Sequence, residues 1–287
     1  MNKKIALVLE GGGMRGAYTA GCLSWLVDEG IEFDAAYGIS TGAVHLTSYL
    51  FKNNYFLHEM STKVIAHKSV IGIRPLIKEG TICSYNHLFD LFLKKEFNFD
   101  IKDIKDCKCD AKYGVYDLEK GETVYLPLKD MNMNILKACC SLPIIGHIVK
   151  EGNHEYLDGG ITKMIPVEEA IKDNCTDFLI ITTKPIDYIR KPAKNFVVWL
   201  MSKVYKKYPK IADHYKVRHL NYEKQINLIK EYEKLGHVIY RYPSEKVDVS
   251  RLRGDQKDLE KLYLLGRKDM EANREAIYNL IKKWKRF

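Results

Sequence analysis

The stretch "IALVLEGGGMRGAY", residues 5–18, decides the fold class of this chain. A short apolar run ends in a glycine-rich loop, and a helical pattern resumes after Gly16. A buried strand that passes through glycines into a helix opens a βαβ layer. The segment "FDAAYGIS", residues 33–40, reads as a second buried strand. The pattern therefore predicts an α/β fold with a mostly parallel central sheet.

Further elements are predicted along the rest of the chain. Helices are expected over 16–29, 41–51 and 130–140 and from 166, a hairpin over 110–127, and strands over 144–157, 177–184 and 237–243. Residues 55–95 read as mixed helical segments, which suggests a cap over one end of the sheet. Helical stretches dominate beyond 186. We expect one α/β domain over residues 1–245, with its motifs in 4–185, and a basic helical segment over 246–287.

Size and composition narrow the class of protein. At 287 residues and 46% hydrophobic content the chain can bury a large core, which excludes disordered and fibrous classes. The apolar run near the N-terminus is too short for a signal peptide, and no stretch has the length of a membrane span. Seven cysteines without a signal sequence suggest a reducing compartment. We expect a cytoplasmic protein, with contact to the inner membrane surface left open.

The net charge of +9 belongs to the C-terminal third. Residues 1–185 carry 21 Lys and Arg against 24 Asp and Glu, whereas residues 186–287 carry 25 against 13. Such a surface can meet anionic lipid or nucleic acid, but no nucleic-acid module is recognisable, so no nucleic-acid partner is expected.

One helical segment of this basic third has two interpretations. The segment "NFVVWLMSKVYKKYPK", residues 195–210, places Phe196, Leu200, Val204 and Tyr208 on one helical stripe beside lysines. It is either an interfacial helix on anionic lipid or a helix whose apolar stripe faces the core, and we favour the second.

The glycine loop fits two kinds of site. Gly11, Gly13 and Gly16 satisfy G-x-G-x-x-G between a strand and a helix, as in a dinucleotide-binding oxidoreductase. That fingerprint expects an acidic residue at the end of the second strand, but this strand ends in "GISTG", residues 38–42. G-x-S-x-G between a strand and a helix is the nucleophile elbow, with Ser40 as nucleophile and Gly38 and Gly42 allowing the tight turn.

Together, the loop and the elbow suggest acyl transfer. Attack by Ser40 on an ester creates an oxyanion, which backbone N–H groups at a helix N-terminus can stabilise. The predicted oxyanion loop comprises Gly11, Gly12, Gly13, Met14, Arg15 and Gly16. The Arg15 side chain either forms a salt bridge that fixes the loop, which we favour, or contacts an anionic head group.

The residues alone leave the general base open. One arrangement is Ser/His/acid, with His147 or His154 as base. The other is a dyad in which Asp158 accepts the proton directly, at a predicted strand end where Gly159 and Gly160 allow a sharp turn. His45, five residues after Ser40, is expected to be structural.

The motifs "GGGMRG", "GISTG" and "DGG", in this order, resemble the patatin-like phospholipases, and the likeness spans about residues 4–185. The segment "CCSLP", with Pro143, also looks like a part of that family. The resemblance implies a three-layer α/β/α fold, a dyad of Ser40 and Asp158, and hydrolysis of a phospholipid or related acyl ester without metal or cofactor. The bacterial cytoplasmic branch is the closer match. A dinucleotide-binding oxidoreductase and a non-catalytic lipid-binding protein of the same fold remain the alternatives.

Overall fold

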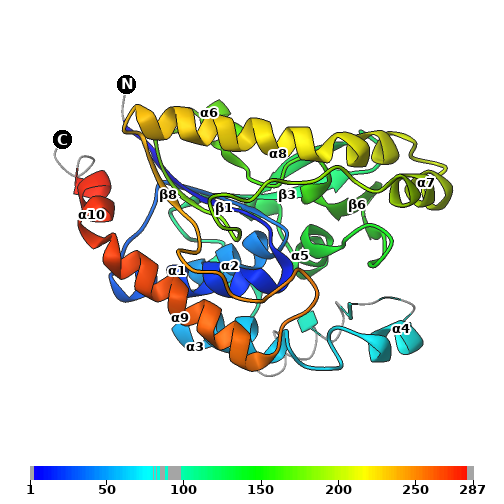
Figure 1. Cartoon of the computed structure of the whole chain (residues 1–287), viewed down its shortest axis with the longest axis horizontal. Coiled ribbons are helices and arrows are strands. Elements are labelled where there is room, and N and C mark those ends of the chain that lie inside the picture. The colour runs from blue at the N-terminus through cyan, green and yellow to red at the C-terminus, as the bar shows by residue number, and fades with distance from the viewer. Residues whose placement is uncertain (1–2, 80, 82, 85–87, 90–97, 283–287) are drawn as a thin grey trace.

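The computed structural model describes residues 3–79, 81, 83–84, 88–89 and 98–282. Figure 1 shows a twisted sheet between two helical layers, with α6 and α8 on one face and α1, α2 and α9 on the other. The predicted three-layer α/β/α fold with a helical C-terminal portion is therefore confirmed. Parts of the predicted cap (80, 82, 85–87 and 90–97) and the end of the predicted C-terminal segment (283–287) lie outside the described residues.

The sheet is mostly parallel. Its strands are β1 (Ile5–Leu9), β2 (Ala35–Ile39), β3 (Asp110–Asp117), β4 (Glu122–Pro127), β5 (Val149–Glu151), β6 (His154–Asp158), β7 (Asp177–Ile181) and β8 (Val238–Arg241). Their order is β5-β6-β3-β2-β1-β7-β8, and β4 pairs with β3 off this path. The central strands β3, β2, β1, β7 and β8 run parallel, whereas β4, β5 and β6 pair antiparallel at one side.

The helices are α1 (Gly16–Asp28), α2 (Thr41–Leu50), α3 (Asn54–Glu59), α4 (Ile73–Glu79), α5 (Met133–Cys140), α6 (Val167–Lys172), α7 (Asn195–Val204), α8 (Lys210–Lys234), α9 (Gln256–Ala272) and α10 (Arg274–Lys282).

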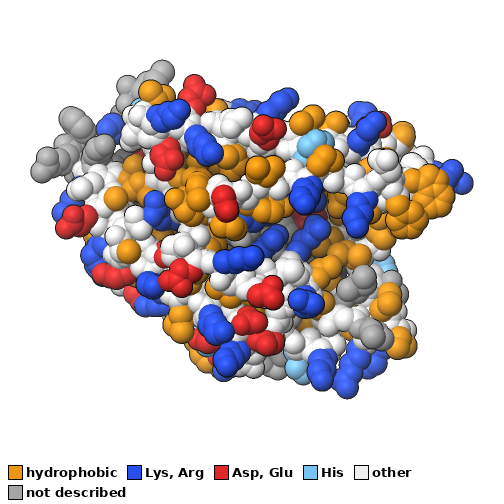
Figure 2. All heavy atoms as spheres, in the orientation of Figure 1, with side chains coloured by type: hydrophobic (Ala, Val, Ile, Leu, Met, Phe, Trp, Pro, Cys, Tyr) orange, Lys and Arg blue, Asp and Glu red, His pale blue; other side chains and the backbone are white. Residues whose placement is uncertain are grey.

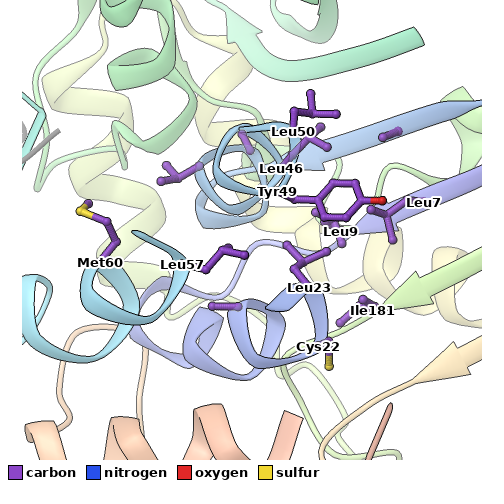
Figure 3. Packing of buried hydrophobic residues seen from close by; sticks show 14 of the residues in the cluster. Leu7, Leu9, Cys22, Leu23, Leu46, Tyr49, Leu50, Leu57, Met60 and Ile181 are labelled. Carbon is purple, nitrogen blue, oxygen red and sulfur yellow. The ribbon is translucent and has the colours of Figure 1, made fainter. Parts of the chain in front are cut away.

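Strand β1 shows how the helices are held on the sheet. Leu7 and Leu9 pack into the cluster formed with α1 and α2, which Figure 3 shows from close by. Ala6 and Val8 point into a second cluster with α6 and α8. Alternate side chains of a strand point to opposite faces, so a continuous apolar run is needed where helices cover both.

One predicted strand is wrong in extent. We expected strand structure over 144–157 with a turn inside it, but β5 begins only at Val149. Ile144 adopts a left-handed backbone conformation with φ 71°, which interrupts an extended chain. The turn falls at Gly152, where φ is 57°, and the hairpin closes as β6.

The C-terminal helices share the core of the sheet domain. Helix α9 crosses α1 in backbone contact: a Cβ added to Gly21 would lie 1.9 Å from Tyr263 O, and one added to Gly266 would lie 2.2 Å from Tyr18 O. Leu262 of α9 belongs to the same buried cluster as β1. The boundary at 245/246 stays a prediction, but residues on both of its sides pack into one core.

Helix α7 does not present the predicted stripe to the core. Tyr208 is buried, whereas Phe196 at the opposite end of the stripe is 66% exposed. The residue turned outward beside Phe196 is Trp199, which is 54% exposed and stacks on it with ring centroids 5.8 Å apart. The preference for a core-facing stripe is therefore wrong for Phe196.

None of the helices within the described ranges combines the length and the apolar character that a membrane span needs.

Candidate active site

Strands β2 and β6 meet end to end along one edge of β3. Strand β2 runs parallel to β3 and ends with Ile39 opposite Gly114, and β6 runs antiparallel and ends with Asp158 opposite Val115. Because the two strands approach from opposite directions, their last residues face neighbouring positions of β3. This register brings Ser40, directly after β2, to Asp158, at the end of β6.

Ser40 has the backbone conformation of a nucleophile elbow. Its φ is 56° and ψ is −130°, a region that costs a non-glycine residue about 1–3 kcal/mol. The neighbouring glycines are required by close packing. A Cβ on Gly38 would lie 2.7 Å from Ala43 Cα, and one on Gly42 would lie 2.7 Å from Leu9 O. The sharp turn presents the Ser40 side chain at the start of α2.

Asp158 is buried at the junction of the strands. Its Oδ1 accepts a hydrogen bond from Gly160 N–H at 2.7 Å, and its own N–H donates to Ser141 O at 2.9 Å. A Cβ on Gly159 would lie 2.7 Å from Gly114 O, so the turn needs glycine. Ser141 belongs to the "CCSLP" segment, which therefore holds the backbone of Asp158.

The environment of Asp158 suits a proton acceptor. Burial raises the pKa of its carboxyl, and the Ser40 hydroxyl, the Gly160 N–H and the charges of Arg218 and Arg251 partly oppose that rise. The Ser40 hydroxyl is thus near enough to influence the carboxyl. Oδ2 is buried and has no hydrogen-bond partner of normal geometry in the part of the chain that the structure describes. That oxygen is available to accept a proton from a hydroxyl that moves closer.

Most amides of the glycine loop already have acceptors. The N–H groups of Gly11, Gly12 and Met14 donate to Met164 O at 3.3 Å, Thr41 Oγ1 at 3.0 Å and Arg251 O at 3.0 Å. Gly16 N–H donates back to Gly13 O at the start of α1. The Gly13 N–H has no acceptor among the described residues. Gly13, where φ is 60°, is therefore a candidate oxyanion donor of the predicted loop.

A buried ion pair lies beneath the loop, and the sequence analysis missed it. Glu10 follows β1 and pairs with Lys184, which follows β7, while Glu10 Oε2 accepts from Thr183 N–H at 2.7 Å. Burial lowers the pKa of Lys184 to about 7. Burial would raise the pKa of Glu10, but Lys184 and Thr183 lower it overall. Charged residues close after two buried strands, Glu10 after β1 and Lys184 after β7, were the available signal.

The histidines lie away from the serine–aspartate pair or are neutral. His147 Nε2 contacts Glu79 O at 3.0 Å, and His154 Nδ1 contacts Asp117 Oδ2 at 3.1 Å. Neither histidine lines a cavity with Ser40. His45 is buried, and burial lowers its pKa to about 4, so its ring is neutral at physiological pH.

Two cavities meet at Ser40. One is apolar and is lined by side chains from the glycine loop, α2 and the segment after α3, including Met14, Val44 and Met60. The other is polar and contains Asp158 and several arginines. Ser40 and Gly13 line both. An ester bond at Ser40 would thus border both an apolar and a cationic space.

The Arg15 side chain has no ion pair among the described residues, so the favoured salt bridge is not observed. Its Nε is buried without a partner there.

In the same described ranges, no group of three or more His, Cys, Asp and Glu side chains could hold a metal ion.

Two curated proteins are similar to this chain. The uncharacterized protein YjjU of Escherichia coli (strain K12) is 25% identical over 211 residues, which are 69% of this chain and 57% of that protein. The probable lipid hydrolase 463L of Invertebrate iridescent virus 6 is 26% identical over 184 residues, 58% of this chain and 63% of that protein. The chain thus spans about three fifths of the length of each.

A solved structure and two family models complete the comparison. The crystal structure of VipD from Legionella pneumophila covers 96% of this chain and 67% of its own, with a TM-score of 0.48 and 11% identity. A domain of unknown function (DUF6363) matches residues 208–282. The model of the patatin-like phospholipases matches residues 7–171, more than half of the chain, including Ser40 and Asp158. The chain therefore belongs to the patatin-like phospholipase family.

Proposed function

We propose that this chain is a serine lipid acyl hydrolase that uses a dyad of Ser40 and Asp158. The observation that carries the proposal is the end-to-end meeting of β2 and β6, which brings the two residues together where Ser40 lines both an apolar and a cationic cavity. Family membership and the name of the viral relative, a probable lipid hydrolase, support the same reaction class.

The proposed reaction has two steps. Ser40 Oγ attacks the ester carbonyl while Asp158 accepts its proton, and Asp158 then donates that proton to the departing alcohol. The Gly13 N–H stabilises the oxyanion. The Gly12 N–H also donates to the oxyanion once it releases its hydrogen bond to Thr41 Oγ1. Water releases the acyl group from Ser40 by the reverse proton transfers.

The alternatives have less support. A dinucleotide would place its phosphates on the glycine loop, but the tip of β2 carries Ser40 with a left-handed φ instead of a ribose-binding carboxylate. A non-catalytic lipid-binding protein needs no buried carboxylate beside the serine, and buried carboxylates are costly.

Hydrolysis of a short p-nitrophenyl ester tests the dyad. Ser40→Ala removes the nucleophile and Asp158→Asn removes the base, so we expect each variant to lose at least about a hundredfold in kcat/KM. A fluorophosphonate probe should add its mass to Ser40 in the wild type.

Ser202→Ala, an exposed serine on α7, is the matched control and should keep full activity and labelling. Wild-type rates in Ser40→Ala would refute the nucleophile. Absence of both turnover and labelling would favour the lipid-binding alternative, and a bound nicotinamide spectrum would favour the oxidoreductase.

We also propose that α7 brings the site to anionic lipid. Phe196 and Trp199 stack on the exposed side of α7, and Lys203 Nζ lies 6.0 Å from the Trp199 ring. Figure 2 shows hydrophobic side chains gathered at the end of the molecule where α7 lies. Leu200 on the same helix lines a groove of ≈ 280 Å³ that also contains Asp158. Lipid held by α7 would therefore lie next to the site, on what we predict is the cytoplasmic side of a membrane.

Vesicle sedimentation tests this contact. Weak, salt-dependent binding to anionic vesicles and weaker binding to neutral ones are expected, because Lys203 lies beside the aromatic pair. Trp199→Ala should reduce binding several-fold. Leu235→Ala, at an exposed apolar residue beyond α8, should leave it unchanged. Equal retention on neutral and anionic vesicles would exclude the electrostatic contact.

A further inference from the structure

Strand β7 ends beside the glycine loop. Glu10 N–H donates to Ile181 O at 3.0 Å, so the ladder between β1 and β7 continues into the loop. Two residues further on, the Thr183 side chain packs against Gly12. A Cβ added to Gly12 would lie 2.5 Å from Thr183 Oγ1 and 2.7 Å from its Cγ2. The loop that carries the proposed oxyanion donors therefore rests on Thr183.

The glycines have no side chains with which to fix the loop. Gly11 packs against Ser40, where an added Cβ would lie 2.6 Å from Ser40 Cβ, and Gly12 packs against Thr183. Neighbouring residues must therefore set the distance between the loop amides and the nucleophile. An oxyanion donor is effective only within about 0.5 Å of its productive place, so this distance matters for the rate.

A single carboxylate holds Thr183. Glu10 Oε2 accepts from Thr183 N–H at 2.7 Å and from Thr183 Oγ1 at 3.0 Å. The other oxygen, Oε1, pairs with Lys184 Nζ. The side chains of Glu10 and Lys184 are 0% and 2% exposed. The carboxylate thus fixes both the backbone and the side chain of the residue on which Gly12 rests.

Lys184 connects this arrangement to α8. Its Nζ lies 5.0 Å from the centre of the Tyr222 ring on α8 and 5.4 Å from that of the Tyr188 ring. A cation over an aromatic face is attracted to the ring, so both rings restrain the ammonium group. A buried ion pair adds little net stability over apolar residues of the same volume, because desolvation offsets the attraction of the charges. A role in positioning therefore explains this pair better than a role in stability.

We propose that Glu10, Thr183 and Lys184 are positioning residues of the oxyanion loop. The ion pair holds Glu10, and Glu10 holds Thr183. Thr183 in turn sets the place of Gly12 and of the Gly13 N–H that follows it. None of the three lines either of the two cavities at the nucleophile, so they act through the loop and not by touching the substrate. This inference rests on the proposed hydrolase function and adds to it the residues that place the oxyanion donors.

Thr183→Val tests the contact at the loop. Valine keeps the size of threonine but removes the hydroxyl that donates to Glu10. We expect kcat on a p-nitrophenyl ester to fall about tenfold and KM to stay within about twofold, because the oxyanion forms only on the way over each barrier. Thr182→Val is the matched control. This buried neighbour has its hydroxyl 3.2 Å from Tyr240 OH, and its substitution should leave both constants unchanged.

The ion pair is tested by removing both of its charges at once. Glu10→Gln combined with Lys184→Met leaves no buried charge unpaired, so the fold should be retained. An amide holds Thr183 less firmly than a carboxylate does, and we expect kcat to fall about tenfold while KM again stays within about twofold. Lys112→Met combined with Asp173→Asn removes a partly buried ion pair between β3 and the end of α6, and should leave kcat unchanged.

A transition-state mimic supplies a readout that a purely structural role would not change. Ser40 Oγ adds to the carbonyl carbon of an alkyl trifluoromethyl ketone while its proton passes to Asp158, and the former carbonyl oxygen becomes an oxyanion at the loop. The inhibition constant of this ketone should rise in parallel with the loss in kcat/KM of both variants. A lower melting temperature with unchanged kcat and unchanged ketone affinity would overturn the inference while the hydrolase proposal stands.

Hydrogen exchange of the loop amides separates this inference from the function on which it rests. The N–H groups of Gly12 and Met14 are hydrogen-bonded in the wild type. They should exchange several-fold faster in Thr183→Val, but not in Thr182→Val, because the loop is then less firmly held. If Ser40-dependent hydrolysis is absent, faster exchange would still support the positioning role, and equal exchange would overturn it. Faster exchange with unchanged kcat would also overturn it, since the loop would then move without consequence for the oxyanion.

Discussion

The glycine loop and the C-terminal third both reach Ser40, but they are held there by different means. The loop is fixed by close packing within the motif region, since a Cβ on Gly11 would lie 2.6 Å from Ser40 Cβ. The C-terminal third is fixed over long range: Arg218 binds Gly160 O, and Arg251 O accepts from Met14 N–H. Short motifs thus encode the backbone geometry around the reacting atoms. The positive charge around those atoms comes largely from residues that no motif encodes.

The largest expected effect lies in the motif region. In Gly159→Ala the new Cβ would meet Gly114 O at 2.7 Å and Gly114 C at 2.8 Å, both backbone atoms. The backbone must shift where β6 meets β2, which moves Asp158 away from Ser40. A displacement of 1 Å can cost about a hundredfold in rate, so we expect a loss of that order in kcat/KM on a p-nitrophenyl ester.

Gly254→Ala is the matched control from the C-terminal third. Its Cβ would meet only side-chain methyls, of which the nearest is Val249 Cγ1 at 3.2 Å, and the activity should stay within about twofold of the wild type. Equal losses in the two variants would remove the distinction between the regions.

The next effect concerns stability and lies in the C-terminal third. Gly266→Ala places a Cβ 2.2 Å from Tyr18 O, so α9 must move away from α1. We expect a loss of about 1–3 kcal/mol in the free energy of unfolding, measured with denaturant. Leu264→Ala, at a residue of α9 that is 54% exposed, should change it by less than about 0.5 kcal/mol. An unchanged Gly266→Ala would mean that α9 is not held by this crossing.

The sequence predicts the motif region well because each of its motifs specifies local geometry. The apolar runs give β1, β2 and β7, and the glycines at 38 and 42 mark the turn that holds Ser40. The position of Asp158 at a strand end was also predicted. The antiparallel direction of β6, which makes its end meet β2 opposite Gly114 and Val115, was not, because strand pairing depends on contacts distant in sequence.

The C-terminal third could be predicted only in its secondary structure and its charge. Helical periodicity indicates α8, α9 and α10, and composition gives the excess of positive charge. Nothing local to Arg190 or Arg251 marks them as cavity residues, because they reach the site through tertiary packing. The same limit explains α7, where periodicity alone assigned Phe196 and Tyr208 to one face although the helix ends at Val204.

The smallest expected effect joins the two regions and appears in the pH dependence of the rate. Asp158 accepts a proton only when ionised, and burial raises its pKa, so activity should fall on acidification at a pH above the ordinary range of an aspartate. The charge of Arg218 lowers that pKa. Arg218→Gln should therefore move the acid limb of kcat/KM for a neutral ester to higher pH, while Arg218→Lys, which keeps the charge, moves it less. Arg253→Gln, exposed and outside the cavity, should leave the limb in place. A loss in Arg218→Gln that is the same at every pH would mean that Arg218 only holds Gly160, and that the C-terminal third supports the dyad by packing instead of charge.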